Sequence, residues 1–218
     1  MAEHEIHIGK KFFKATEWAA ELHAARAHGS RATTPSIGQV LGIASLVLED
    51  GGTEREATAA MLLDAIGDGD APIDEIREEF GKKLAALVQR CIDDRPSTGI
   101  DASQADTATW KQRRTRYVEQ LGKHDDVDVL RLAAADTLRE VRALVSDLRR
   151  HGSIAFARFH TPPSDQLAYY RDLLVAFTVR MPRGHLTQEL RVAIAEMERL
   201  VELDTATAAW RVAHVDAA

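Results

Sequence analysis

The sequence has 218 residues, a formal net charge of −6 and 45% hydrophobic residues, enough for one large or two small globular domains. No stretch reaches the roughly 18 consecutive apolar residues of a membrane span, and the N-terminal segment MAEHEIHIGKK is charged where a signal peptide needs an apolar run. Nucleic acid is a poor partner for this chain because phosphate backbones bind net-basic surfaces. We therefore expect a cytoplasmic protein with a small-molecule ligand.

Apolar residues recur at helical spacing along the chain, and no segment alternates with a period of two, so the sequence predicts an all-α fold. The first helix is expected from about Lys10 to His28. The second begins at Thr34-Pro35-Ser36, because proline favours the first helical position, and ends at Gly51-Gly52. The third begins at Thr53, which is spaced to form a capping box with Glu56.

The later helices are separated by glycine, proline and polar breaks. We expect them at residues 73–80, 84–92, about 110–121, about 127–150, from 163 onward, and from Thr187 to about His214. The polar stretch 94–106 has no periodicity and is expected to form a loop. The domains are therefore a tail (1–9), one helical domain (10–181) and a C-terminal helix packed on it (182–218). An amphipathic terminal helix also suits a homodimer contact.

Acidic residues at apparently inward positions are the first candidates for chemistry. Asp64 continues the face of Ala57, Ala60 and Met61, and a buried carboxylate is costly unless it is paired or binds a metal. Asp136 and Glu140 are four residues apart on one helix, where like charges repel unless a cation or proton lies between them. The alternative is that Asp136 and Glu140 lie on a solvated edge and that Asp64 caps a neighbouring turn.

The only cysteine, Cys91, falls on an apolar stripe with Leu84, Leu87 and Val88. A single cysteine cannot form an internal disulfide, and it cannot supply even two of the ligands of a thiolate metal site. We expect it to be a core residue.

Several long runs carry a family resemblance, among them LVLEDGGTEREATAAMLLDAIGDGDAPIDEIREEFGKKLAALVQRCID, WKQRRTRYV and LRLAAADTLREVRALVSDLRRHG. Over about residues 12–181 the chain resembles small HD-domain proteins related to the hydrolase half of alarmone synthetase-hydrolases. The resemblance implies a helical domain that binds a divalent metal, commonly manganese. In the family this metal activates water against the 3′-pyrophosphate of guanosine tetraphosphate.

The family's metal motif is only partly present. The first histidine of the motif aligns with Gln39, the His-Asp pair with Leu63-Asp64, and the Glu-Asp pair with Gly67-Asp68. The distant aspartate is Asp136, and the asparagine after it is replaced by Glu140. The resemblance thus implies that both imidazole ligands and the catalytic glutamate are missing.

The resemblance also marks basic residues that suit an anionic ligand. Lys111, Arg113 and Arg114 match a family segment in which guanidinium groups hold phosphate, although such runs are usually solvated. Arg31 aligns with a basic group near the nucleotide base, and His23 with a common histidine of the first helix. A lone histidine on an apolar face is more often a core residue than a ligand.

Three functions remain open at this point. The first is a pseudoenzyme or regulator that binds a phosphorylated molecule or nucleotide in the former cleft, with no cofactor beyond weakly bound Mg²⁺ or Mn²⁺ at Asp64 and Asp136. The second is a metal-independent isomerase, cyclase or lyase that uses Asp64, Asp68, Asp136 and Glu140 as acid and base. The third is a divalent-metal nucleotide pyrophosphohydrolase, with oxygen ligands from Gln39 and the acids Asp64, Asp136 and Glu140.

Overall fold

The structure, a computed structural model, describes residues 8–27, 37–67, 73–94, 107–159 and 161–214. Within these residues the chain forms helices and their connections, with no strand, which confirms the all-α fold. The helices are α1 (Lys10–Ala27), α2 (Ile37–Glu49), α3 (Glu54–Gly67), α4 (Ile73–Phe80), α5 (Lys82–Asp94), α6 (Thr107–Lys123), α7 (Val127–His151), the 3-10 helix η1 (Gly152–Arg158), α8 (Pro163–Arg180) and α9 (His185–His214).

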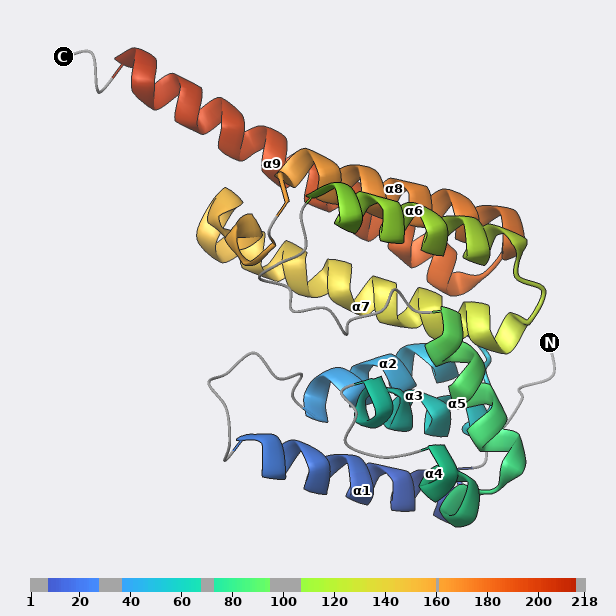
Figure 1. The fold of residues 1–218 in the computed structure, drawn as a ribbon. Coiled ribbons are helices and arrows are strands. Elements are labelled where there is room, and N and C mark those ends of the chain that lie inside the picture. The colour runs from blue at the N-terminus through green and yellow to red at the C-terminus, as the bar shows by residue number, and fades with distance from the viewer. Residues whose placement is uncertain (1–7, 28–36, 68–72, 95–106, 160, 215–218) are drawn as a thin grey trace.

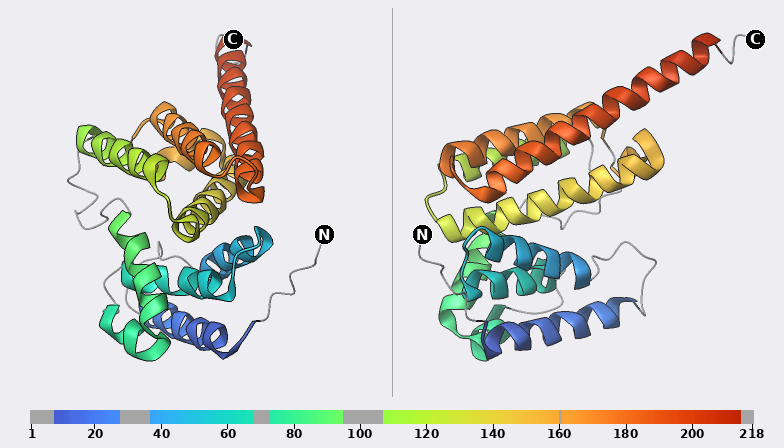
Figure 2. Two further views of the ribbon diagram at one scale, coloured as in Figure 1. Left: turned by 90° about the vertical axis from the view of Figure 1, so that its right-hand side faces the viewer. Right: turned by 180° about the vertical axis from the view of Figure 1, so that it is seen from behind.

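The long helix α7 separates two groups of helices (Figure 1). Helices α1 to α5 lie on one side of it, and α6, α8 and α9 lie on the other, as the views in Figure 2 also show. The expected core stripe of α7 is buried: Leu130, Ala134, Leu138, Val141, Val145 and Leu148. Helix α7 packs against both groups of helices. Side chains of α7 outside this buried stripe can therefore meet residues from either group.

Local sequence signals set most helix ends. The backbone N–H of Thr53 donates to Glu56 Oε2 at 2.7 Å, and the N–H of Glu56 approaches Thr53 Oγ1 at 3.4 Å, so the expected capping box begins α3. Gly152 follows the last turn of α7 with a φ of 59°, a conformation that favours glycine. The sequence did not predict η1, the 3-10 helix that begins at the same glycine.

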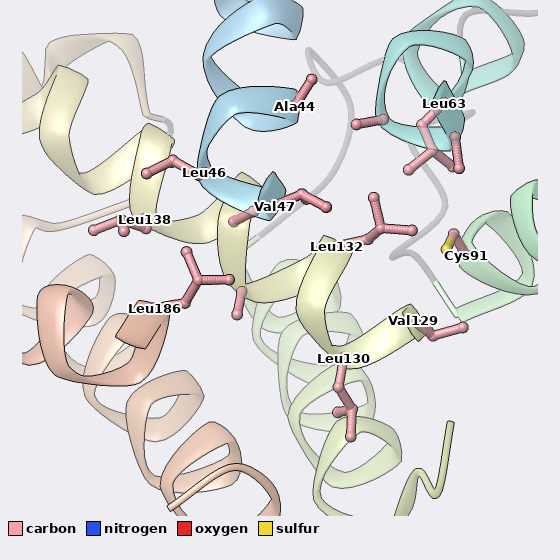
Figure 3. Close-up of a cluster of buried hydrophobic side chains, with 14 of the residues drawn as sticks. Ala44, Leu46, Val47, Leu63, Cys91, Val129, Leu130, Leu132, Leu138 and Leu186 are labelled. Carbon is pink, nitrogen blue, oxygen red and sulfur yellow. The ribbon is translucent and has the colours of Figure 1, made fainter. Parts of the chain in front are cut away.

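Helix α3 differs from the expectation of one inward face. Every residue from Glu56 to Leu63 is buried, because α1, α2 and α5 all contact this helix. Figure 3 shows Leu63 of α3 and Cys91 of α5 near Leu132 of α7, in the apolar cluster between the helices. Cys91 is a buried core residue, as expected. Since α3 is buried all round, helical spacing alone does not decide where Asp64 points.

The last helix is only partly packed. Leu186, Leu190, Ile194 and Met197 are buried in the main core, so the first half of α9 is part of the bundle. The C-terminal part of α9 extends beyond the other helices (Figure 2), and Trp210 on it is 58% exposed. The division into a tail (1–9), a helical domain (10–181) and a C-terminal helix packed on it (182–218) remains a proposal. No helix in the described ranges is long and apolar enough to cross a membrane.

Candidate active site

The two acids of α7 lie on the face that the sequence indicated. Asp136 and Glu140 are both partly buried, so neither stands on a fully solvated edge. Asp136 lines a small cavity of about 20 Å³ together with Leu63 of α3 and Cys91 of α5. Apart from Asp136 and the phenol of Tyr117, the cavity wall is apolar or thiol in character. Asp136 is thus the carboxylate on an otherwise mostly apolar wall between α3, α5, α6 and α7.

Two tyrosines of α8 belong to this region. The Tyr170 hydroxyl hydrogen-bonds Glu140, and the Arg114 guanidinium hydrogen-bonds Tyr169. The guanidinium carbon of Arg114 lies 4.3 Å from the centre of the Tyr169 ring and 5.4 Å from that of Trp110. Helices α6, α7 and α8 thus join into one polar network around Glu140.

Neither tyrosine is among the site residues predicted from the sequence. The adjacent pair in LAYYRDLL was the available signal, because neighbouring residues on a helix face directions about 100° apart and can serve two partners.

The network sets the ionisation of its members. Burial raises the pKa of Tyr169 to about 12, although the nearby Arg114 opposes the shift. Burial and then the Glu140 charge raise the pKa of Tyr170 well above 10. Burial alone would lower the pKa of Arg114, but Tyr169 and Glu140 outweigh it and the pKa is raised. At neutral pH the site therefore holds two neutral hydroxyl donors and one permanent cation.

An alkaline titration tests this network. The chain has three tyrosines, and we expect Tyr169 and Tyr170 to ionise only well above the ordinary pKa of about 10. A pKa that is raised in the folded state adds stability below pH 10, and this stability is lost as the pH rises through about 12 for Tyr169. Absorbance of tyrosinate near 295 nm, compared with tyrosine-to-phenylalanine variants, measures the two steps.

Arg114→Met should raise the pKa of Tyr169 further, because the attraction between tyrosinate and guanidinium is lost. If Tyr169 and Tyr170 ionise near pH 10 while the protein is still folded, this description of the network is wrong.

The basic residues of α6 do not act as one cluster. Lys111 is exposed, and its ammonium lies 3.0 Å from the carboxylate of Asp165 on α8. Arg113 is partly exposed, and Arg114 is held by the two aromatic rings. A groove of about 270 Å³ between α6 and α8 is lined by Lys111 and Arg114, but also by Asp165 and Asp172. Of the three, Arg114 is the one fixed next to the acids of α7.

The other expected site residues are less fully defined. Gln39 lies in the first turn of α2 and is partly buried. Asp64 lies in the last turn of α3 and His23 in α1, but their side chains are outside the described part of the structure. Arg31 and Asp68 also fall outside the described residues. Asp64 is therefore assigned to the candidate site only from its position on α3.

Comparison with known proteins places the fold. The family model described as HD domain matches residues 15–161, about two thirds of the chain. The chain belongs to the HD-domain family. Its likeness to a solved structure of a metazoan ortholog of SpoT that hydrolyses ppGpp has a TM-score of 0.61 at 18% identity and covers 87% of this chain and 97% of that one. For lmo0812 from Listeria monocytogenes the TM-score is 0.58 at 18% identity, covering 72% and 96%. At these identities the two structures show the HD fold.

The curated relatives carry one name, guanosine-3′,5′-bis(diphosphate) 3′-pyrophosphohydrolase MESH1. The mouse protein is 26% identical over 62% of this chain and 69% of its own length. The zebrafish protein, from Danio rerio, is 29% identical over 49% of this chain and 61% of its own length. The matched part of the HD domain is thus shared with proteins named as hydrolases.

These relatives overturn the expectation of a pseudoenzyme. That expectation had inferred lost catalysis from the replacement of the histidines, whereas the named relatives and the ppGpp-hydrolysing structural match favour an active alarmone hydrolase. The expected absence of a cofactor is likewise unsupported, and Mg²⁺ or Mn²⁺ is compatible with the relatives. The expected small-molecule nucleotide ligand is consistent with them.

The donor atoms of the candidate site fit a particular kind of metal. Leu63 borders the Asp136 cavity where the family has a histidine, and it cannot ligate. Among the described side chains no group of three or more His, Cys, Asp or Glu is close enough to hold a metal. The candidates are oxygens, from Asp136 and Glu140 on α7 and from Asp64 and Gln39 by position. An oxygen-only set fits a hard cation such as Mg²⁺ or Mn²⁺ rather than an imidazole-dependent site.

Proposed function

We propose that this protein is a divalent-metal-dependent nucleotide pyrophosphohydrolase that removes the 3′-pyrophosphate of guanosine 3′,5′-bis(diphosphate). The observation that carries the proposal is the position of Asp136, which lines a cavity against the last turns of α3 in an HD fold. The names of the curated relatives support the substrate class. Hydrolysis of the 3′ phosphoester consumes one water and yields GDP and pyrophosphate.

The oxygens of Gln39, Asp64, Asp136 and Glu140 would hold the metal. When bound, such a metal supplies a Lewis acid that lowers the pKa of water and offsets phosphate charge. Glu140 is oriented by the Tyr170 hydroxyl, which donates to it. Glu140 would also accept a proton from water, since Gly67, which aligns with the family's catalytic glutamate, has no carboxylate.

Arg114 of α6, which interacts electrostatically with Glu140, would supply fixed positive charge. Its guanidinium is packed against Tyr169 and Trp110, so its rotamers are restricted before any ligand arrives. A cation that is already oriented stabilises developing negative charge without reorganising in the reaction. The neutral hydroxyl of Tyr169 beside it offers one further donor, because its raised pKa keeps it protonated at neutral pH.

The proposal is tested with the full chain purified without chelators. We expect release of pyrophosphate and GDP from guanosine 3′,5′-bis(diphosphate) in the presence of Mn²⁺ or Mg²⁺, loss of the activity with EDTA, and recovery on adding metal. Elemental analysis of the same sample measures bound metal directly. Absence of product with enzyme at substrate concentration, in Mn²⁺ and in Mg²⁺, would refute the proposal.

A further inference from the structure

A second cavity lies away from the candidate active site. It has a volume of about 350 Å³ and is formed where the start of α3 meets α1 and the turn between α4 and α5. Four of its lining side chains are basic (Lys11, Arg55, Lys82 and Lys83), and one, Glu54, is acidic. The whole chain has a net charge of −6, so this lining departs from the average of the surface.

Lys11 is held at the cavity by a neutral group. Its ammonium donates to the Phe80 carbonyl at 2.9 Å. That carbonyl ends α4, and Gly81 then turns the chain into α5 with a φ of +93°, a conformation that favours glycine. A Cβ at Gly81 would lie 3.8 Å from the Lys11 ammonium. Because its acceptor is a carbonyl, the positive charge of Lys11 is positioned but not neutralised.

Lys82 and Lys83 add two more charges at an unfavourable place. They form the first turn of α5, which contains no acidic residue. The exposed amides of a helix start are electropositive, so cations there are normally disfavoured. Both lysines are exposed, and neither forms an ion pair with a residue in the described ranges. Three lysines therefore line the cavity, and Glu54 is the one acidic side chain among its lining residues.

The remaining charged groups have other partners. Glu54 accepts the backbone N–H of Gly9 at 2.9 Å, which ties the start of α1 to α3. Arg55 forms an ion pair with Asp128 at the start of α7. The charge of Arg55 is balanced by Asp128, and Glu54 offsets part of the charge of Lys11, Lys82 and Lys83, so the lining keeps a net positive charge.

We propose that this cavity is a second binding site, for a small anion that carries one or more phosphate groups. Its volume falls in the range of small-molecule pockets, roughly 300–1,000 Å³. Lysine ammoniums bind phosphate as point charges, and a multiply charged anion would relieve the mutual repulsion of the three lysines.

The site is separate from the candidate active site. On α3 the cavity is lined by Glu54, Arg55 and Thr58, and Asp64 is six residues beyond Thr58 on the same helix. At 1.5 Å per residue this is about 9 Å along the axis. The inference therefore stands independently of the hydrolysis proposed above, although both α3 and α5 run from this cavity to the region of Asp136.

Titration with inorganic pyrophosphate at constant ionic strength, followed by the backbone amide signals of Gly81, Lys83 and Leu84, tests the proposal. We expect saturable shifts, and an affinity for pyrophosphate that is lower by about tenfold or more in K82Q/K83Q. The matched control is R116Q/R150Q, which removes the same charge at exposed positions of α6 and α7. It should bind as the unaltered protein does.

Binding at this cavity should also persist in D136N, which separates it from any binding at the candidate active site. K11Q offers a second, single substitution with the same expected direction. Absence of saturable shifts at these three amides, or an equal loss in K82Q/K83Q and R116Q/R150Q, would overturn the proposal.

Discussion

Replacing Asp136 with asparagine should lower metal-dependent pyrophosphate release from guanosine 3′,5′-bis(diphosphate) by about 100-fold or more. Asp136 is the described carboxylate on the wall of the cavity that faces α3. Asparagine keeps the shape of the side chain but removes the anionic oxygen, and hard cations depend on such oxygens. The measurement is kcat/KM at saturating Mn²⁺, together with the metal concentration needed for half-maximal rate.

Asp125→Asn is the matched control for this substitution. Asp125 lies in the turn before α7, its side chain is 91% exposed, and its partner Arg180 is near the surface. It should retain the rate of the unaltered protein within about twofold, since surface changes of this kind have small effects. Unchanged activity in D136N, with a normal unfolding midpoint, would exclude Asp136 from the reaction and with it the proposed site.

Glu140→Gln should have a smaller effect than D136N. Glutamine retains an oxygen that can accept the Tyr170 hydroxyl, so the network between α7 and α8 is kept while the negative charge is lost. Comparing the two variants at several metal concentrations distinguishes a metal ligand from a proton acceptor. A ligand shifts the metal dependence, whereas a proton acceptor lowers kcat at saturating metal.

Most helix positions followed from local signals in the sequence. The capping box of Thr53 and Glu56 and the glycine after α7 depend only on neighbouring residues. The buried stripe of α7 was also predictable, because one helix face meets the core at a regular interval. Such features need no knowledge of the rest of the fold.

Helix α3 marks the limit of periodicity. A helix that is surrounded on all sides has no polar face, so its apolar spacing cannot distinguish inward from outward. The spacing argument for Asp64 assumed one buried face, and the structure removes that assumption. What surrounds α3 depends on helices from several parts of the chain.

For the candidate site, the arrangement of residues on one helix was predictable from the sequence. The contacts between helices were not. The spacing of Asp136 and Glu140 fixed a common face of α7. The contact of Arg114 with Tyr169 joins residues 55 positions apart, and it exists because α6 and α8 lie side by side. The pseudoenzyme expectation failed for a different reason, since it equated missing histidines with missing activity.

Arg131→Met should lower the free energy of unfolding by about 3 kcal/mol or more. Arg131 on α7 lies 2.9 Å from Asp50 after α2 and also pairs with Glu56 of α3, and the side chains of the two acids are 7% and 1% exposed. Asp50 accepts in addition the N–H of Leu186 at the start of α9. Methionine fills much of the volume but leaves two carboxylates without a cation, which is costly inside a protein. Equilibrium unfolding in urea measures the loss.

A second substitution shows whether unpaired charge is the cause. In the triple variant R131M/D50N/E56Q the amide oxygens can still accept the N–H groups of Leu186 and Thr53, and no buried charge remains. It should recover part of the stability lost in R131M. Arg142→Met, on the same helix and in an exposed pair with Glu189, should cost less than about 1 kcal/mol. If R131M and R142M lose the same small amount, the buried cluster does not hold α2, α3, α7 and α9 together, and the apolar core alone sets their arrangement.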